Sequence, residues 1–217
     1  MNKSLPIFPL GIVVLPGNIQ SLQIFEPRYL KMIKDVMHGD NQFVISLLSN
    51  TNQDISFKDK GTLVEIIDFN DLPNGLLGIT VKGTTRVEIS SAEINEDDYH
   101  VGQIFPISEP TVDDQALLAK FPELINVLSQ LKEHPKVREL PIDINLSSAD
   151  SVSFHLGGLI PLSPLDKQLL LDAFDAGQRL NILSRLLDEI STSSRNCLLY
   201  TSPSPRDLST SRMPSSA

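Results

Sequence analysis

The chain has 217 residues, of which 41% are hydrophobic and 21% charged, and 27 acidic against 18 basic residues give it a net charge of −9. These proportions are those of an ordinary soluble globular protein, long enough for one sizeable domain or two small ones. An acidic surface repels phosphates, so the composition argues against broad electrostatic binding to nucleic acid or to an anionic membrane. The single cysteine, Cys197, excludes an internal disulfide and a cysteine-rich zinc site.

The opening stretch, MNKSLPIFPLGIVVLPG (1–17), places a lysine before an apolar run, as a secretory signal does. Pro6, Pro9 and Pro16 interrupt the helix that such a signal forms, and no small-residue cleavage site follows. No apolar stretch approaches the roughly 20 residues needed to cross a bilayer. The sequence therefore predicts a cytoplasmic protein with no membrane segment.

Up to about residue 108 the pattern is typical of short strands joined by turns. The segment IVVLPG (12–17) ends in a Pro-Gly turn, and Asn74–Gly75 is a strong hairpin signal before an alternating strand over 77–81. Further strands are expected at FVISLL (43–48), GTLVEIIDF (61–69), RVEIS (86–90) and VGQIFPI (101–107).

From residue 109 to about 192 the apolar residues recur at helical spacing. Pro122 is expected to kink the first helix or split it in two, and Gly157–Gly158 to stop a short second one. Ser163 followed by Pro164 is typical of a capped helix start. A last helix is expected to carry Leu180, Leu183, Leu187 and Ile190 on one face.

Residues 193–217 are rich in serine and proline and carry no apolar period, so the sequence predicts a disordered tail. The part over 196–217 resembles a translated sequencing-adapter artefact. We therefore leave it out of functional interpretation.

No familiar catalytic pattern is present. The sequence lacks a nucleotide-binding phosphate loop, a dinucleotide-binding glycine motif and a serine nucleophile elbow, and its four histidines never have metal-ligand spacing. Gly75–Gly78 has the spelling of an RNA-binding GXXG loop, but the hairpin explains it better. The acidic run at 95–100 reads as a solvated loop rather than a cation site. We therefore expect no catalytic residues, no cofactor and no metal.

The stretch QIFEPRYLKMI (23–33) sets a charged pair around a proline. Pro27 suits the first position of a helix, which places Glu26 near its N-cap, where negative charge is favoured. Leu30, Ile33 and Met37 would then form the apolar stripe, with Tyr29 beside it. Glu26 and Arg28 are expected to pair with each other or with nearby backbone. A carboxyl beside an arginine has a depressed pKa and makes a poor general base, which favours a structural role.

Four segments occur in an order and spacing that resemble a known family. They are PIFPLGIVVLPG, IFEPRYLKMI, GTLVEIIDFNDLPNGLLGITVKGTTRVEI and PLSPLDKQLLLDAFDAGQRLNIL, and together they resemble the N-terminal, substrate-binding domain of the Lon ATP-dependent protease over about residues 4–190. The resemblance implies an α+β fold, with a PUA-like, β-barrel-like lobe (4–108) followed by a helical lobe (109–192), in one domain over 4–192. The signature residues carried over as scaffold are Phe25, Glu26, Pro27, Arg28 and Tyr29.

The Lon motor and peptidase domains have no counterpart in this sequence, so the resemblance is to the free-standing bacterial Lon-N proteins. It implies a non-enzymatic module that binds unfolded or degron-bearing polypeptides, as an adaptor for a protease or chaperone. An exposed apolar patch, such as one in the cleft between the lobes, would serve this purpose. Two alternatives stay open: an RNA-binding PUA-like protein, against which the charge argues, and a hydrolase of an unrecognised kind.

Overall fold

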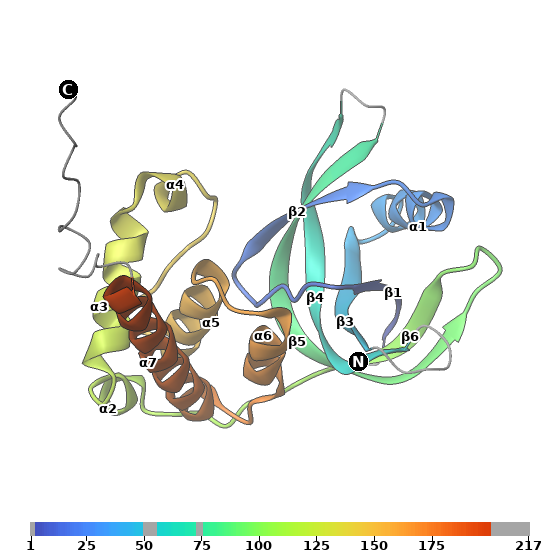
Figure 1. Cartoon of the computed structure of the whole chain (residues 1–217). Helices are drawn as coiled ribbons and strands as arrows, with labels where there is room; N and C mark the ends of the chain where they lie inside the picture. The colour runs from blue at the N-terminus through green and yellow to red at the C-terminus, as the bar shows by residue number, and fades with distance from the viewer. Residues whose placement is uncertain (1–2, 50–55, 73–75, 201–217) are drawn as a thin grey trace, which may run out of the picture. The chain divides into compact units, whose positions relative to one another are not determined.

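The computed structural model describes residues 3–49, 56–72 and 76–200 (Figure 1). The chain divides into a compact unit over residues 1–183 and a second unit over 184–217. The described strands, all in the first unit, are β1 (Lys3–Leu10), β2 (Ile19–Ile24), β3 (Gln42–Ser49), β4 (Ser56–Asp71), β5 (Leu77–Ile94) and β6 (His100–Pro106). The described helices are α1 (Pro27–Met37), α2 (Asp114–Leu118), α3 (Pro122–Glu133), α4 (Pro135–Arg138), α5 (Ala149–Leu159), α6 (Pro164–Asp172) and α7 (Ala176–Tyr200), the last of which continues into the second unit.

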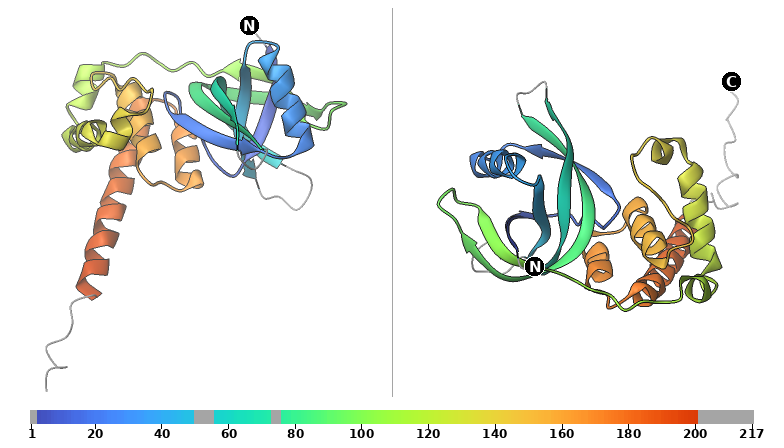
Figure 2. Two further views of the ribbon diagram at one scale, coloured as in Figure 1. Left: turned by 90° about the horizontal axis from the view of Figure 1, so that it is seen from above. Right: turned by 180° about the vertical axis from the view of Figure 1, so that it is seen from behind.

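The six strands form one mixed sheet that closes on itself. Its order is β2-β5-β4-β3-β1-β6, and β6 pairs in turn with β5. The long strand β5 makes this possible, because its first part pairs with β2 at Ile19–Ile24 and its later part with β6. Among the described strand pairs, only β1 and β3 run parallel. The expected α+β fold with a barrel-like N-terminal lobe is confirmed, and Figure 2 shows the strands with α1 and the group of helices α2–α6 from two further sides.

Helix α1 packs on the barrel core through one face. Tyr29, Met32, Ile33 and Val36 are buried, and the Phe8 and Tyr29 ring centroids lie 4.2 Å apart. The expected stripe was partly wrong, because Leu30 is 37% exposed. The buried face is centred on Met32 and Ile33, and successive helical residues are rotated by about 100°, so Leu30 falls at its edge.

Two helix-boundary predictions are confirmed in the helical lobe. Pro122 starts α3 after α2 has ended at Leu118, so the proline splits the expected helix in two. Ser163 caps α6, since its Oγ accepts a hydrogen bond from the backbone N–H of Asp166 at 3.1 Å.

The predicted stop at Gly157–Gly158 was wrong, because α5 runs through both glycines and ends at Leu159. Tight packing, rather than helix termination, explains them. A Cβ on Gly157 would lie 2.4 Å from Leu170 Cδ1, and one on Gly158 would lie 2.1 Å from Asn18 Oδ1. The two glycines therefore let α5 approach α6 and the turn before β2.

Three further expectations differ from the structure or lie outside it. The segment 12–15 is not a strand, whereas Lys3–Leu10 forms β1 despite two prolines. The backbone is helical as far as Tyr200, so the predicted disorder from 193 does not begin there. Asn74–Gly75 and residues 201–217 lie outside the described residues, although the strands flanking that turn pair as far as Asp71 opposite Leu77.

A buried ion network joins the barrel to the helices. Arg86 of β5 and Arg179 of α7 both donate to the carboxylate of Glu109. Arg86 bonds Glu109 through Nη2, and its Nη1 donates to the carbonyl oxygens of Leu171 and Ala173 at 2.7 and 2.6 Å. Because a buried charge is costly unless it is paired, this network fixes these segments relative to one another.

Candidate functional site

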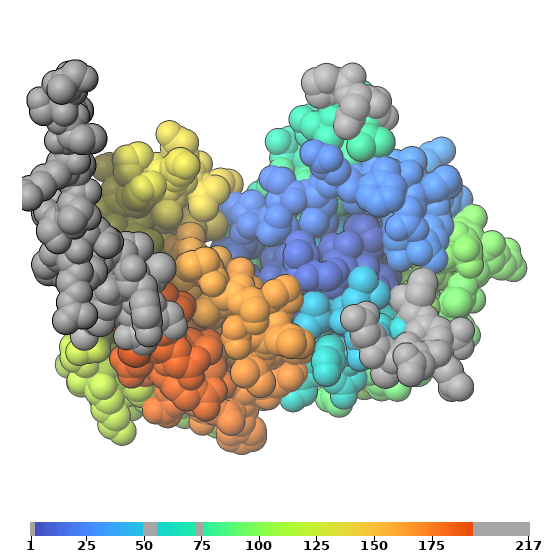
Figure 3. Space-filling view, in the orientation of Figure 1, coloured from blue at the N-terminus to red at the C-terminus, as the bar shows by residue number. Residues whose placement is uncertain are grey.

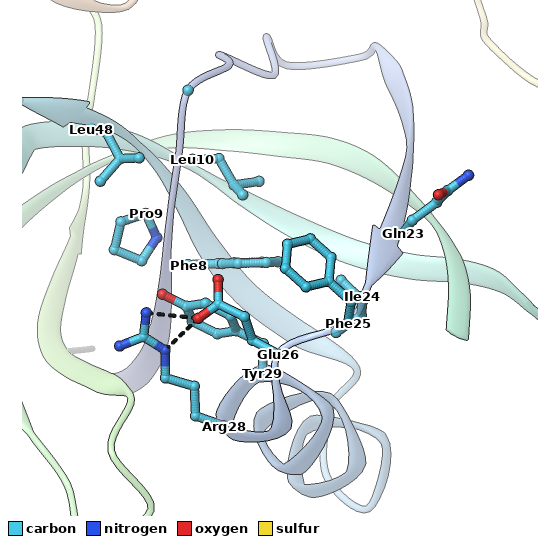
Figure 4. Close-up of a pocket in the computed structure, with 11 residues that line it drawn as sticks. Phe8, Pro9, Leu10, Gln23, Ile24, Phe25, Glu26, Arg28, Tyr29 and Leu48 are labelled. Atoms are coloured by element: carbon cyan, nitrogen blue, oxygen red, sulfur yellow. Dashed lines mark hydrogen bonds and ion pairs between the residues drawn. The ribbon is translucent and has the colours of Figure 1, made fainter. Parts of the chain in front are cut away.

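A groove of about 320 Å³ opens at the start of α1. We call it the signature groove, because four of the five signature residues line it; Pro27 does not. The lining residues are Phe8, Pro9, Leu10, Gly11, Gln23, Ile24, Phe25, Glu26, Arg28, Tyr29 and Leu48 (Figure 4). In the space-filling view of this face, dark-blue β1 lies between the lighter blue of β2 and α1 and the cyan end of β3 (Figure 3).

The groove lies where the barrel wall is incompletely paired. Strand β6 pairs with β1 only from Lys3 to Ile7, so residues 8–10 of β1 have a neighbour on the β3 side alone. Strand β2 pairs with β5 and with no other described strand. Both free edges carry backbone hydrogen-bonding groups that could pair with another extended chain.

Aromatic side chains form the floor and the rim. Phe8 and Tyr29 are each 5% exposed and pack together at the floor, whereas Phe25 at the rim is 66% exposed. Leu48 adds a second exposed apolar side chain, at 41%. Since exposed aromatic surface gains free energy when it is removed from water, the rim is suited to apolar contact with a ligand.

The charged signature residues pair with each other. Arg28 donates to Glu26 Oε2 from Nε at 2.9 Å and from Nη2 at 2.8 Å. Its guanidinium carbon lies 4.7 Å from the centre of the Tyr29 ring, a cation–π distance. Glu26 stands at the N-cap position, as the following proline predicted, but its side chain makes no cap bond because it turns toward Arg28.

The hydroxyl of Tyr29 has no hydrogen-bond partner among the described residues. The residue as a whole is 5% exposed, but its hydroxyl oxygen is not among the fully buried unpaired atoms. Burial raises the pKa of Tyr29; the positive charge of Arg28 opposes this shift and the negative charge of Glu26 adds to it. The phenol is therefore protonated at neutral pH and is available as a donor. Figure 4 shows the ring running behind Glu26 toward the guanidinium of Arg28.

The two buried histidines are not among the residues that line the groove. Burial lowers the pKa of His100, whose ring meets Phe57 edge-on at 5.2 Å. Burial also lowers the pKa of His155, whose Nδ1 lies 2.8 Å from the Ser151 carbonyl oxygen. Neither histidine lines the signature groove.

The acidic run at 95–100 forms a turn between β5 and β6. Asn95 Oδ1 accepts hydrogen bonds from the backbone N–H groups of Asp97 and Tyr99, both at 3.1 Å. Among the side chains that the structure describes, over residues 3–49, 56–72 and 76–192, no group of three His, Cys, Asp or Glu is placed to hold a metal ion. The same part of the chain contains no helix long and apolar enough to span a bilayer.

Sequence reasoning identified one wall of the groove and missed the other. The signature residues were recognised, but as scaffold. Phe8, Pro9 and Leu48 come from β1 and β3, and only the fold brings them opposite α1. No local pattern in the sequence marks these three as groove residues.

The comparisons with proteins of known sequence agree with one another. The family model described as the ATP-dependent protease La (LON) substrate-binding domain matches residues 4–189. The Lon protease of Azorhizobium caulinodans is 26% identical over 212 residues, covering 87% of this chain and 23% of that protein. The Lon protease of Heliobacterium modesticaldum is 28% identical over 200 residues, covering 85% of this chain and 24% of that protein. The chain thus spans about a quarter of the length of these relatives.

Solved structures share the fold. The crystal structure of a Lon N-terminal domain protein from Xanthomonas campestris has a TM-score of 0.67 and 27% identity, covering 84% of this chain and 98% of that one. The N-terminal domain of a Mycobacterium avium complex Lon protease has a TM-score of 0.64 at 19% identity, covering 83% of this chain and 96% of that chain. Because the family model matches residues 4–189, most of the 217-residue chain, the chain belongs to the LON substrate-binding domain family.

Proposed function

We propose that this chain is a non-enzymatic polypeptide-binding module and that the signature groove is its binding surface. The observation that carries the proposal is Phe25, a large aromatic side chain 66% exposed on the rim of an aromatic groove. Folding does not require such exposure, and rigid exposed aromatic residues are typical of binding hot spots. Membership in a substrate-binding family supports the same conclusion.

The residues that line the groove favour a polypeptide ligand over a nucleic acid. Among the described residues that line the groove, only Glu26 and Arg28 are charged, and they neutralise each other. The chain as a whole carries a net charge of −9. Binding to RNA depends on neutralising phosphates with basic side chains. Binding through apolar contact needs no such charge and depends little on salt.

Within the cell we propose a cytoplasmic adaptor that holds unfolded or degron-bearing chains for a protease or chaperone. The matched segment spans about a quarter of the length of the Lon proteases among its relatives. A pull-down from the native host with the full chain tests this role. Recovery of neither a protease nor a chaperone would contradict it.

The binding proposal is tested by fluorescence anisotropy of a labelled unfolded protein titrated with the full chain at two salt concentrations. Saturable binding that changes little with salt is expected. Absence of binding up to high micromolar concentration would overturn the proposal, and binding to labelled RNA that weakens steeply with salt would replace it with the nucleic-acid alternative.

A further inference from the structure

One hydroxyl group at the signature groove has no hydrogen-bond partner among the described residues. Tyr29 is 5% exposed and lines the groove, and its hydroxyl makes no hydrogen bond with any described residue. Its oxygen is not among the fully buried unpaired atoms of the described residues, so it is accessible and free to donate a hydrogen bond. An acceptor on a ligand in the groove could receive this hydrogen bond.

Arg28 presents a second donor beside this hydroxyl. Its Nε and Nη2 are both held by Glu26 Oε2. A guanidinium carries five N–H donors, and no hydrogen bond within the described structure engages Nη1. The cation–π contact at 4.7 Å keeps the guanidinium against the Tyr29 ring. Two donors from adjacent residues of α1 are thus positioned together, and the ion pair with Glu26 holds one of them in place.

A pair of donors calls for an oxygen acceptor in the ligand, and the local charge indicates which kind. Glu26 already neutralises Arg28, and the chain as a whole is acidic. A carboxylate or phosphate would therefore meet no net positive charge in the groove. A neutral carbonyl fits better, and an extended polypeptide offers one at every residue, with side chains alternating between its two faces.

We propose that the signature groove binds an internal, extended polypeptide segment, one backbone carbonyl of which accepts hydrogen bonds from Tyr29 Oη and Arg28 Nη1 while a neighbouring apolar side chain packs against Phe25. This inference rests on the proposed function and adds the contacts that would recognise the backbone. The free edges of β2 and of residues 8–10 of β1 border the same groove. They offer further backbone pairing of the kind used in strand addition.

The test is Tyr29→Phe, which removes only the hydroxyl. The probe is a fluorescein-labelled Gly/Ser peptide with a central Phe-Leu-Phe and amidated ends, titrated with the full-length chain. We expect the variant to bind about 3- to 10-fold more weakly, the range expected for one hydrogen bond. Its melting temperature should not fall, because the hydroxyl has no partner within the fold.

The matched control is Tyr99→Phe. The hydroxyl of Tyr99 donates to Asp35 Oδ2 at 3.2 Å, and Tyr99 does not line the groove. Its removal should leave peptide affinity unchanged. A second variant, Arg28→Lys, keeps the charge but loses the fork of donors, and it should weaken binding as Tyr29→Phe does.

The outcomes separate the inference from the proposed function. If the wild-type chain binds the peptide and Tyr29→Phe binds it equally well, the backbone-carbonyl contact is wrong and the polypeptide-binding function stands. If the wild-type chain binds neither the peptide nor unfolded protein, the proposed function itself fails. Binding only to a peptide with a free C-terminal carboxylate would overturn the internal-segment proposal in favour of chain-end recognition.

Discussion

The fully buried guanidinium of Arg179 holds the carboxylate of Glu109 by two hydrogen bonds, from Nη1 to Oε1 at 2.9 Å and to Oε2 at 2.8 Å. The same guanidinium stacks on the Phe154 ring at 4.1 Å and forms an ion pair with Asp150. Because Arg86 reaches Glu109 from the barrel, this one carboxylate serves two buried cations.

Replacing Glu109 with Gln should therefore be strongly destabilising. The change leaves Arg86 and Arg179 buried without the charge they share, and breaking a buried ion pair costs about 3–5 kcal/mol in free energy of unfolding. Urea denaturation measures the loss. The matched control is Glu133→Gln, since Glu133 is 73% exposed and lies 4.0 Å from Arg138; its effect should not exceed about 1 kcal/mol. Equal losses in the two variants would contradict the importance of the buried network.

Gly158→Ala should destabilise the protein although alanine is the better helix former. The helix-propensity gain of about 1 kcal/mol is outweighed because the new Cβ would lie 2.1 Å from Asn18 Oδ1, and overpacking costs about 1–3 kcal/mol. Thermal and urea unfolding test this prediction. The control, Gly39→Ala, meets no atom nearer than 3.6 Å and should change stability little.

A double-mutant cycle identifies the contact responsible. Asn18 donates to the Phe154 carbonyl oxygen at 2.9 Å, so Asn18→Ala is itself destabilising. In that background the clash is gone, and Gly158→Ala should cost less than it does in the wild-type chain. Additive losses would show that the clash with Asn18 is not the cause.

Stability should fall as the pH drops below about 6.5, the ordinary pKa of histidine. Burial lowers the pKa of His155 and of His100 in the folded state, so below that pH the unfolded chain takes up protons that the folded chain does not. The free energy of unfolding therefore decreases with decreasing pH until the folded-state pKa values are reached. His155→Gln should reduce this slope, and adding His100→Gln should reduce it further; urea midpoints between pH 7 and pH 5 measure both. Unchanged slopes in these variants would show that His155 and His100 do not cause the pH dependence of stability.

Glu26→Gln should affect stability far less than Glu109→Gln. The side chains of Glu26 and Arg28 are 41% and 25% exposed, and ion pairs near solvent contribute about 0–1 kcal/mol. A loss in urea as large as that of Glu109→Gln would favour the scaffold interpretation of the signature. A small loss would show that the Glu26–Arg28 pair is not needed for stability, which agrees with a role in ligand binding.

Local chemistry made several elements predictable. Pro122 cannot continue a helix, and a serine before a proline is a good helix start, so both boundaries could be read directly. The strands over 43–48 and 86–90 have clear apolar patterns. By contrast, β1 contains two prolines that argue against a strand, and it forms because β3 and β6 pair with its remaining residues.

Contacts between residues far apart along the chain could not be predicted from the sequence. Arg86, Glu109 and Arg179 are far apart along the chain, and nothing local marks them as one network. Gly157 and Gly158 looked like a helix stop because the neighbours that require them, Leu170 and Asn18, belong to other elements. The signature groove is a similar case, since its second wall comes from β1 and β3.

The most direct test of the central claim compares Phe25→Ala with Phe174→Ala in anisotropy titrations of a labelled unfolded protein. The two phenylalanines are 66% and 72% exposed, but only Phe25 lines the signature groove. Loss of a hot-spot aromatic typically costs more than about 1 kcal/mol of binding free energy, so Phe25→Ala should bind about tenfold more weakly while Phe174→Ala binds like wild type. Equal affinities for wild type and Phe25→Ala would contradict the groove as the binding surface.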